Sequence, residues 1–232
     1  MIREIAEHDE LEEAVRLQRL IWGFEDVDLL PLRLFVVATK IGGHVLGAFD
    51  GGRMVGFSLA IPGLKPGGVV YWHSHMMGVL PEYRDRGIGR ELKFRQREDA
   101  LARGIKLIEW TFDPLELKNA YLNIEKLGVI VRRYVLNQYG NTTSPLHGGL
   151  PTDRCVAEWH LDLERHPPGI EARIPIPVEI GNLRRAEPVR AREIQKAASE
   201  QFLDCFRRGL AVVGFERSDA AGTYLLAPWP SA

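Results

Sequence analysis

Apolar positions along the chain predict two helices first and then a set of strands. They recur at helical spacing in residues 9–22 and 31–41, and a glycine follows closely after each segment. Short apolar runs bounded by turn residues then predict a hairpin from 44–49 and 54–61, followed by a long strand over 69–80.

The middle of the chain alternates between helices and strands. The helix after the long strand is expected to lead into a strand over 105–112. A second helix is expected to begin with Asp113 as its N-cap and to end at Gly128. Strands over 129–136 and 154–163 follow. This order predicts a mixed α/β or α+β sheet with a β-α-β unit in its second half.

The last third of the chain has a less regular pattern. Residues 174–177 predict an extended segment, 188–208 a helix, and 210–226 a closing pair of strands. These elements are too few for an independent domain. We therefore expect one domain over 1–163 and a C-terminal extension over 164–232 that packs on it.

Composition narrows the classes of function. The 232 residues include 45% hydrophobic ones, and 30 basic against 31 acidic residues leave a net charge of −1. A balanced charge gives no general attraction to nucleic acid or to a membrane surface. Two distant cysteines, Cys155 and Cys205, and an N-terminus without an apolar leader predict a cytoplasmic protein.

Residues 79–92 carry the most informative chemistry, because an apolar strand runs through a proline and a basic turn into a helix. The first amides of a helix have no intrahelical acceptor and lie at the positive end of its dipole. Gly87 and Gly89 remove the Cβ atoms that would keep a phosphate away from these amides. Three arginines add charge and donors. They are Arg84, Arg86 and Arg90. The segment predicts a pyrophosphate site.

Two common phosphate motifs do not fit this segment. Leu92 stands where the dinucleotide fingerprint needs its third glycine, and the triphosphate loop G-x-x-x-x-G-K-[ST] does not occur. The remaining pattern, Arg84-x-x-Gly87-x-Gly89, resembles the [QR]-x-x-G-x-[GA] motif of the GNAT acetyltransferase superfamily, which holds the pyrophosphate of acetyl-coenzyme A (acetyl-CoA). The runs HSHMMGV (73–79) and WTFDPL (110–115) are similar to a subgroup whose acceptor is not established.

The resemblance covers residues 1–163 and implies a fold, an activity and a set of binding residues. The implied fold is a mixed, mostly antiparallel sheet flanked by helices. The implied activity is transfer of an acetyl group from acetyl-CoA to the amine of a small molecule, by direct attack in a ternary complex without a metal. The residues implied to bind the coenzyme are Gly78, Val79, Leu80, Arg84, Arg86, Gly87, Ile88, Gly89, Arg90 and Asn119. Gly78 also predicts a bulge or a close backbone approach in its strand.

Deprotonation of the attacking amine requires a base. His73 and His75 lie two apart on one predicted strand, so both are expected on one face together with Met77. By its spacing from the turn, His73 falls where histone-acetylating members of the superfamily place a glutamate. Glu109 on the neighbouring predicted strand is the alternative base.

The leaving thiolate is protonated in many family members by a tyrosine four residues before the glycine that ends the second helix. Ile124 occupies that position here. Tyr121 lies three residues earlier on the same predicted helical face and is the candidate substitute.

Other functions remain open at this level. His73 and His75 could bind a metal with Glu109 or Asp113, and the isoleucine at 124 would suit a non-catalytic acetyl-CoA sensor or scaffold. An RNA-binding role for the arginines is disfavoured by the balanced charge. We expect a small-molecule amine as partner and neither nucleic acid nor membrane. A homodimer is an open expectation.

Overall fold

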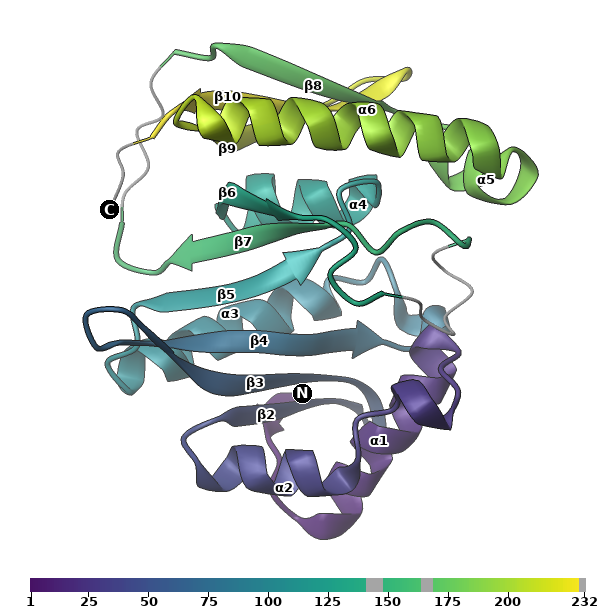
Figure 1. Ribbon diagram of the computed structural model, residues 1–232. Helices are drawn as coiled ribbons and strands as arrows, with labels where there is room; N and C mark the ends of the chain where they lie inside the picture. The colour runs from purple at the N-terminus through teal and green to yellow at the C-terminus, as the bar shows by residue number, and fades with distance from the viewer. Residues whose placement is uncertain (141–147, 164–168, 230–232) are drawn as a thin grey trace. The chain divides into compact units, whose positions relative to one another are not determined.

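The computed structural model describes residues 1–140, 148–163 and 169–229. These residues divide into two compact units. Unit 1 comprises Met1–Trp110 and His160–Asp162, and unit 2 comprises the other described residues. Figure 1 labels the helices and strands of both units. In the described part of the chain, no helix has both the length and the apolar character needed to cross a membrane.

Unit 1 contains the helices and strands predicted for the first half of the chain, with a short additional strand at its start. Its elements are β1 Ile2–Glu4, α1 His8–Trp22, the 3-10 helix η1 Asp26–Asp28, α2 Leu32–Lys40, β2 His44–Asp50, β3 Arg53–Lys65, β4 Val69–Val79, the 3-10 helix η2 Pro81–Tyr83, α3 Ile88–Ala102 and β5 Leu107–Phe112, whose last two residues belong to unit 2. The strand order is β1-β2-β3-β4-β5. Neighbouring strands are antiparallel except β4 and β5, which are parallel.

Helices cover both faces of the unit 1 sheet (Figure 1). Helix α1 packs on the face to which Gly78 belongs, since a side chain there would collide with Ile21 and Trp22. Helix α3 packs on the opposite face, where its Lys93 contacts Ser74 of β4. Each amphipathic helix presents an apolar face to the sheet. The buried apolar side chains of the helices and strands together form the core of unit 1.

Unit 2 combines the second half of the family region with the predicted extension. Its further elements are α4 Leu117–Tyr121, the π-helix η3 Leu122–Lys126, β6 Ile130–Val135, β7 Arg154–His160, β8 Ala172–Pro177, α5 Ile180–Ala186, α6 Pro188–Arg207, β9 Leu210–Arg217 and β10 Ala221–Pro228. The strand order is β7-β6-β9-β10-β8, with every pair antiparallel. The extension therefore continues the sheet beyond β6. Helix α5 is not among the predicted elements.

Aromatic packing holds α6 against the unit 2 sheet. Phe202 stacks on Tyr134 of β6 with ring centres 5.3 Å apart and meets Tyr224 of β10 edge to face at 5.0 Å. At the edge of the sheet, β8 carries Pro175 and Pro177. Proline cannot donate to a further strand, so this edge is protected against pairing with another chain.

Candidate functional site

The predicted pyrophosphate turn has the geometry of an anion site. Gly87 adopts a left-handed conformation with φ of 84°, which lets the chain turn directly into α3 at Ile88. Among the described residues, no side chain caps this helix N-terminus. The amides of its first turn therefore keep their donor capacity for a ligand.

Gly89 leaves open space beside these amides. A Cβ placed on Gly89 would meet only the Cε of Met77, at 3.6 Å, which is an ordinary contact. Packing within the protein therefore does not require glycine at this position. The space beside these amides is therefore open to a ligand, and the residues present fit a coenzyme pyrophosphate.

The three arginines of the turn are exposed, and the contacts described for them are with backbone carbonyl oxygens and aromatic rings. Arg84 donates to the carbonyl oxygens of Val79 at 3.3 Å and Ile21 at 3.2 Å, which ties the turn to β4 and α1. Arg86 donates to the carbonyl of Glu82 at 2.8 Å, and Arg90 covers the ring of Phe94. Their charge adds to the positive end of α3.

Strands β4 and β5 pair over only two positions. Trp72 lies opposite Ile108, and His73 lies opposite Glu109. No further pair forms between them in the described residues, although β4 continues to Val79. The strands therefore part beyond His73, and this opening lies on the side of the pyrophosphate turn.

The bulge in β4 lies at His75 and not at Gly78. Ser74 lies opposite Ala60 and Met76 opposite Leu59, so His75 has no partner in β3. Of the two alternatives predicted for Gly78, the close approach to its backbone is confirmed, because a Cβ there would lie 2.8 Å from the side chain of Trp22. The packing of α1 side chains, rather than a backbone irregularity, explains the glycine.

The bulge also changes which side chains share a face. His73 and His75 lie together, with ring centres 5.7 Å apart. Met77 lies opposite Ser58, in the row that also contains Ser74, so it is on the other face of the sheet. The prediction that Met77 accompanies the two histidines is therefore wrong, because an extra residue reverses the alternation of a strand.

Burial and neighbouring charges control the protonation of the two histidines. Burial, the nearby His75 and the nearby Lys93 lower the pKa of His73 to about 4, although Glu109 acts in the opposite direction. Burial also lowers the pKa of His75. Both imidazoles are therefore neutral at pH 7, and a neutral imidazole can accept a proton.

Glu109 is buried, with 4% of its surface exposed, and its carboxylate accepts a hydrogen bond from Lys65. The Lys65 ammonium also lies 5.4 Å from the ring centre of Tyr71. The Glu109 carboxylate is thus already engaged by Lys65, and the choice between His73 and Glu109 as the base stays a prediction.

The residues predicted on the second helix lie in unit 2. Asn119 is exposed, and Tyr121 is half-buried with Lys126 and Arg217 close to its ring. Ile124 is buried, with 1% exposed. The sequence places Ile124 where many family members carry tyrosine, and its apolar side chain is part of the core.

The second helix begins later than Asp113, and the prediction of Asp113 as its N-cap is wrong. Asp113 accepts a hydrogen bond from the amide of Leu115 at 2.8 Å, which closes a turn, and α4 begins at Leu117. Asp113 also accepts from Arg184 of α5 at 2.7 Å. Arg184 donates to Glu116 as well, at 2.9 Å, so the extension anchors the approach to α4. No pattern in the sequence indicated this contact.

Metal ligation is not supported for the histidine pair. Within the described chain, the one group of three potential ligands is His8, Asp9 and Glu12, all exposed at the start of α1. Exposed acidic groups of this kind are common without a metal. Neither His73 nor His75 belongs to such a group in the residues that the structure describes. The metal-free reaction stays a prediction.

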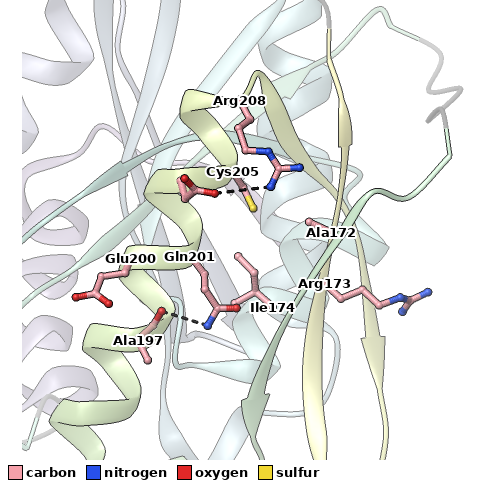
Figure 2. Close-up of a pocket in the computed structure, with 9 residues that line it drawn as sticks. Ala172, Arg173, Ile174, Ala197, Glu200, Gln201, Cys205 and Arg208 are labelled. Atoms are coloured by element: carbon pink, nitrogen blue, oxygen red, sulfur yellow. Dashed lines mark hydrogen bonds and ion pairs between the residues drawn. The ribbon is translucent and has the colours of Figure 1, made fainter.

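The surface of the described residues has two hollows that can be compared with the predicted site. One is lined by none of the predicted site residues, and the other is lined by two of them. The larger, about 540 Å³, lies between α6 and β8 (Figure 2), where Arg208 pairs with Asp204 at 3.7 Å. It contains none of the predicted site residues. The smaller, about 240 Å³, lies in unit 1 beside the pyrophosphate turn and includes Arg86 and Ile88.

Solved structures show that this fold is shared with acetyltransferases. Aminoglycoside 6'-acetyltransferase type Ii is similar with a TM-score of 0.55 and 21% identity, over 71% of this chain and 99% of that one. The ribosomal-protein-S18-alanine N-acetyltransferase from Escherichia coli has a TM-score of 0.54 and 16% identity, over 73% and 98%. The yncA protein from Salmonella typhimurium, solved with its cofactor acetyl-CoA, has a TM-score of 0.56 and 16% identity. The match covers 73% of this chain and 98% of that one.

The family follows from the sequence itself. The model of the acetyltransferase (GNAT) family matches residues 8–128, more than half of the chain. The chain therefore belongs to the GNAT family of acetyltransferases, and the predicted family and fold are confirmed. No curated protein matches the sequence.

Proposed function

We propose that this protein transfers the acetyl group of acetyl-CoA to the amine of a small molecule, with both substrates bound together. The observation that carries the proposal is the uncapped N-terminus of α3, with Gly89 leaving space beside its first amides. Similar structures include an aminoglycoside 6'-N-acetyltransferase complexed with coenzyme A (CoA), at a TM-score of 0.52 and 18% identity.

In this proposal the turn holds the pyrophosphate. The amides of Ile88, Gly89 and Arg90 donate to its oxygens, and the exposed arginines contribute charge. The parted ends of β4 and β5 accept the pantetheine arm alongside Gly78 and Val79. The amide of Leu80 already donates to the carbonyl of Val55 at 2.9 Å, so Leu80 contributes through its other atoms.

The acid–base properties of the site favour a weakly basic acceptor. Moving a proton from an alkylammonium, with a pKa of about 10.4, to His73, with a pKa of about 4, is unfavourable by about 9 kcal/mol. For an α-amine of pKa about 7.8 the same transfer is unfavourable by about 5 kcal/mol, and about a tenth of such an amine is neutral at pH 7. We therefore expect an acceptor amine with a pKa no higher than that of an α-amine, so that an appreciable fraction is neutral at pH 7.

The leaving thiolate needs little assistance. A thiol with a pKa of about 8.5 costs about 2 kcal/mol to release unprotonated at pH 7. Tyr121 is the proposed proton donor, since it is half-buried on α4 and carries a hydroxyl. A modest effect of its removal would be consistent with this small cost.

A second candidate is a non-catalytic acetyl-CoA sensor or scaffold. The specific observation in its favour is Ile124, which is buried where many family members have a catalytic tyrosine. A sensor would bind acetyl-CoA and release no thiol with any amine. An enzyme would release CoA at a rate that depends on the acceptor.

Calorimetry and a thiol-release assay test the two candidates together. We expect CoA to bind the wild type, and Gly89→Val to weaken that binding by at least about tenfold, because a branched side chain fills the space beside the amides. Gly89→Ala is the matched control, since the family motif permits alanine and the space accommodates a Cβ.

The acceptor panel should contain small amines of different pKa and peptides with free N-termini. Turnover of small amines supports the proposal, and turnover of peptides alone would replace the acceptor class. Binding without any turnover would favour the sensor. Absence of CoA binding, or equal binding by Gly89→Val, would refute the coenzyme site.

A further inference from the structure

Lys93 of α3, which belongs to unit 1, is buried, with 2% of its surface exposed. Its ammonium nitrogen lies 2.8 Å from the hydroxyl of Ser74 and 3.3 Å from the amide oxygen of Gln96, and it donates to both. The same nitrogen lies 3.6 Å from the ring centre of Trp110. These contacts account for its position between the helix and the sheet.

Stability does not explain a lysine at this position. No carboxylate pairs with Lys93 in the described residues. A buried amine without an opposite charge is destabilising, and an apolar side chain of similar length fills the same volume without that cost. Burial lowers the pKa of Lys93 well below its usual value, which reflects the same penalty. Such residues are often retained for function.

The position of Lys93 coincides with the opening between β4 and β5. The last paired residues are His73 and Glu109, so the next residue on each strand is Ser74 on β4 and Trp110 on β5. Lys93 contacts both of these residues. Its nitrogen therefore lies at the first unpaired position of the two strands.

The bulge of β4 begins at the same point. His75, which has no partner in β3, directly follows Ser74. A hydrogen bond from Lys93 to the Ser74 hydroxyl fixes the residue before the bulge, and the attraction of its nitrogen to the Trp110 ring fixes the other side of the opening. One side chain thus connects the two strands where their backbones separate.

We propose that Lys93 is a positioning residue for acetyl transfer, which acts through Ser74 and Trp110 to hold β4 and β5 apart where the acetyl thioester binds. The inference rests on the proposed function, in which the pantetheine arm enters this opening. A methionine would fill the volume but would make neither the hydrogen bond to Ser74 nor the contact of the Lys93 nitrogen with the Trp110 ring. The opening would then lose its defined width.

The test compares Lys93→Met with wild type in calorimetry with CoA and with acetyl-CoA, in thermal unfolding, and in acetyl transfer to the best amine. We expect an unchanged or higher Tm, CoA affinity within about twofold, and acetyl-CoA affinity reduced by about fivefold or more. We expect kcat to fall by about 10- to 100-fold, because a small displacement of reacting groups has an effect of that size.

Ser74→Ala is the second variant, since it removes the acceptor of the hydrogen bond and keeps Lys93. We expect acetyl-CoA affinity and kcat to fall in this variant as well, but by less than in Lys93→Met. Lys40→Met, at an exposed lysine of α2, is the matched control and should match wild type in every measurement.

The outcomes separate this inference from the proposed function. Wild type that binds neither CoA nor acetyl-CoA would refute the proposed function and this inference with it. Wild type that binds both, with Lys93→Met and Ser74→Ala retaining wild-type acetyl-CoA affinity and kcat, would overturn the role of Lys93 alone. A parallel loss of Tm and of CoA affinity would indicate a purely structural lysine and would also overturn it.

Discussion

His73 is the side chain on which the proposed chemistry most depends. It lies at the last position where β4 pairs with β5, beside His75 and opposite Glu109. Its imidazole is neutral throughout the physiological range because burial opposes protonation. An imidazole with so low a pKa accepts a proton readily only from an ammonium group whose own pKa is low. The pKa of His73 therefore bears on which class of amine can be the acceptor.

Replacement of His73 by glutamine should lower kcat by about 100-fold with an α-amine acceptor, because general base catalysis typically contributes that much or more. His75→Gln is the matched control and should have a smaller effect. In wild type, kcat/KM between pH 5 and 8 should rise with the deprotonation of the amine, since His73 titrates near pH 4. Steady-state kinetics across this range is the measurement. An unchanged rate in His73→Gln would remove His73 from the role of base.

At the scale of elements, α4 depends on a contact from the C-terminal extension. Arg184 of α5 is buried and donates to Asp113 and Glu116, the residues that lead into α4. Tyr224 of β10 donates to the carbonyl of Pro114 at 2.6 Å in the same turn. The extension thereby holds the turn before the helix that carries Asn119 and Tyr121.

Arg184→Met should reduce the free energy of unfolding by about 3 kcal/mol, because it removes the guanidinium that pairs with the buried Asp113 carboxylate. The double variant Arg184→Met with Asp113→Asn should recover part of this loss, since the remaining group is uncharged. Urea denaturation of the two single variants and the double variant measures the coupling. Additive losses would show that Arg184 and Asp113 do not stabilise one another.

At the scale of the molecule, the buried His44 and the half-buried His73 and His75 of unit 1 make stability depend on pH. Burial lowers the pKa of His44, His73 and His75 below the usual value near 6.5. For His44, which stacks on Trp72, the charge of Asp99 and the hydrogen bond with it oppose the lowering of the pKa without reversing it. All three therefore favour the folded state in their neutral form.

The free energy of unfolding should fall as the pH is lowered from 6.5 toward 4. In that window the unfolded chain binds protons at these histidines and the folded chain does not, and above pH 6.5 the contribution is fully present. His73 alone contributes up to about 3 kcal/mol. The difference between the urea unfolding midpoints at pH 7.5 and pH 4.5 should be smaller in His73→Gln than in wild type. His8→Gln, at an exposed histidine, is the control, and an equal pH dependence in His73→Gln would contradict the assignment.

The sequence by itself determined the family and the order of most elements, and it predicted the pyrophosphate turn. Each of these depends on residues close together in the chain: helical spacing, glycines at turns, and the pattern from Arg84 to Gly89. The strand β1 and the helix α5 escaped prediction because three residues and a polar seven-residue segment carry too little periodic signal.

Only the tertiary structure decided which polar side chains are buried and what they contact. Lys93 is not among the residues singled out from the sequence, and Glu109 is named there only as the alternative base. In the structure Lys93 contacts Ser74 and Trp110, and Glu109 pairs with Lys65. The bulge at His75 depends on its register with β3, and a strand's own sequence does not contain its partner's register. Burial and register arise from contacts between residues distant in the chain, and local patterns carry no information about such contacts.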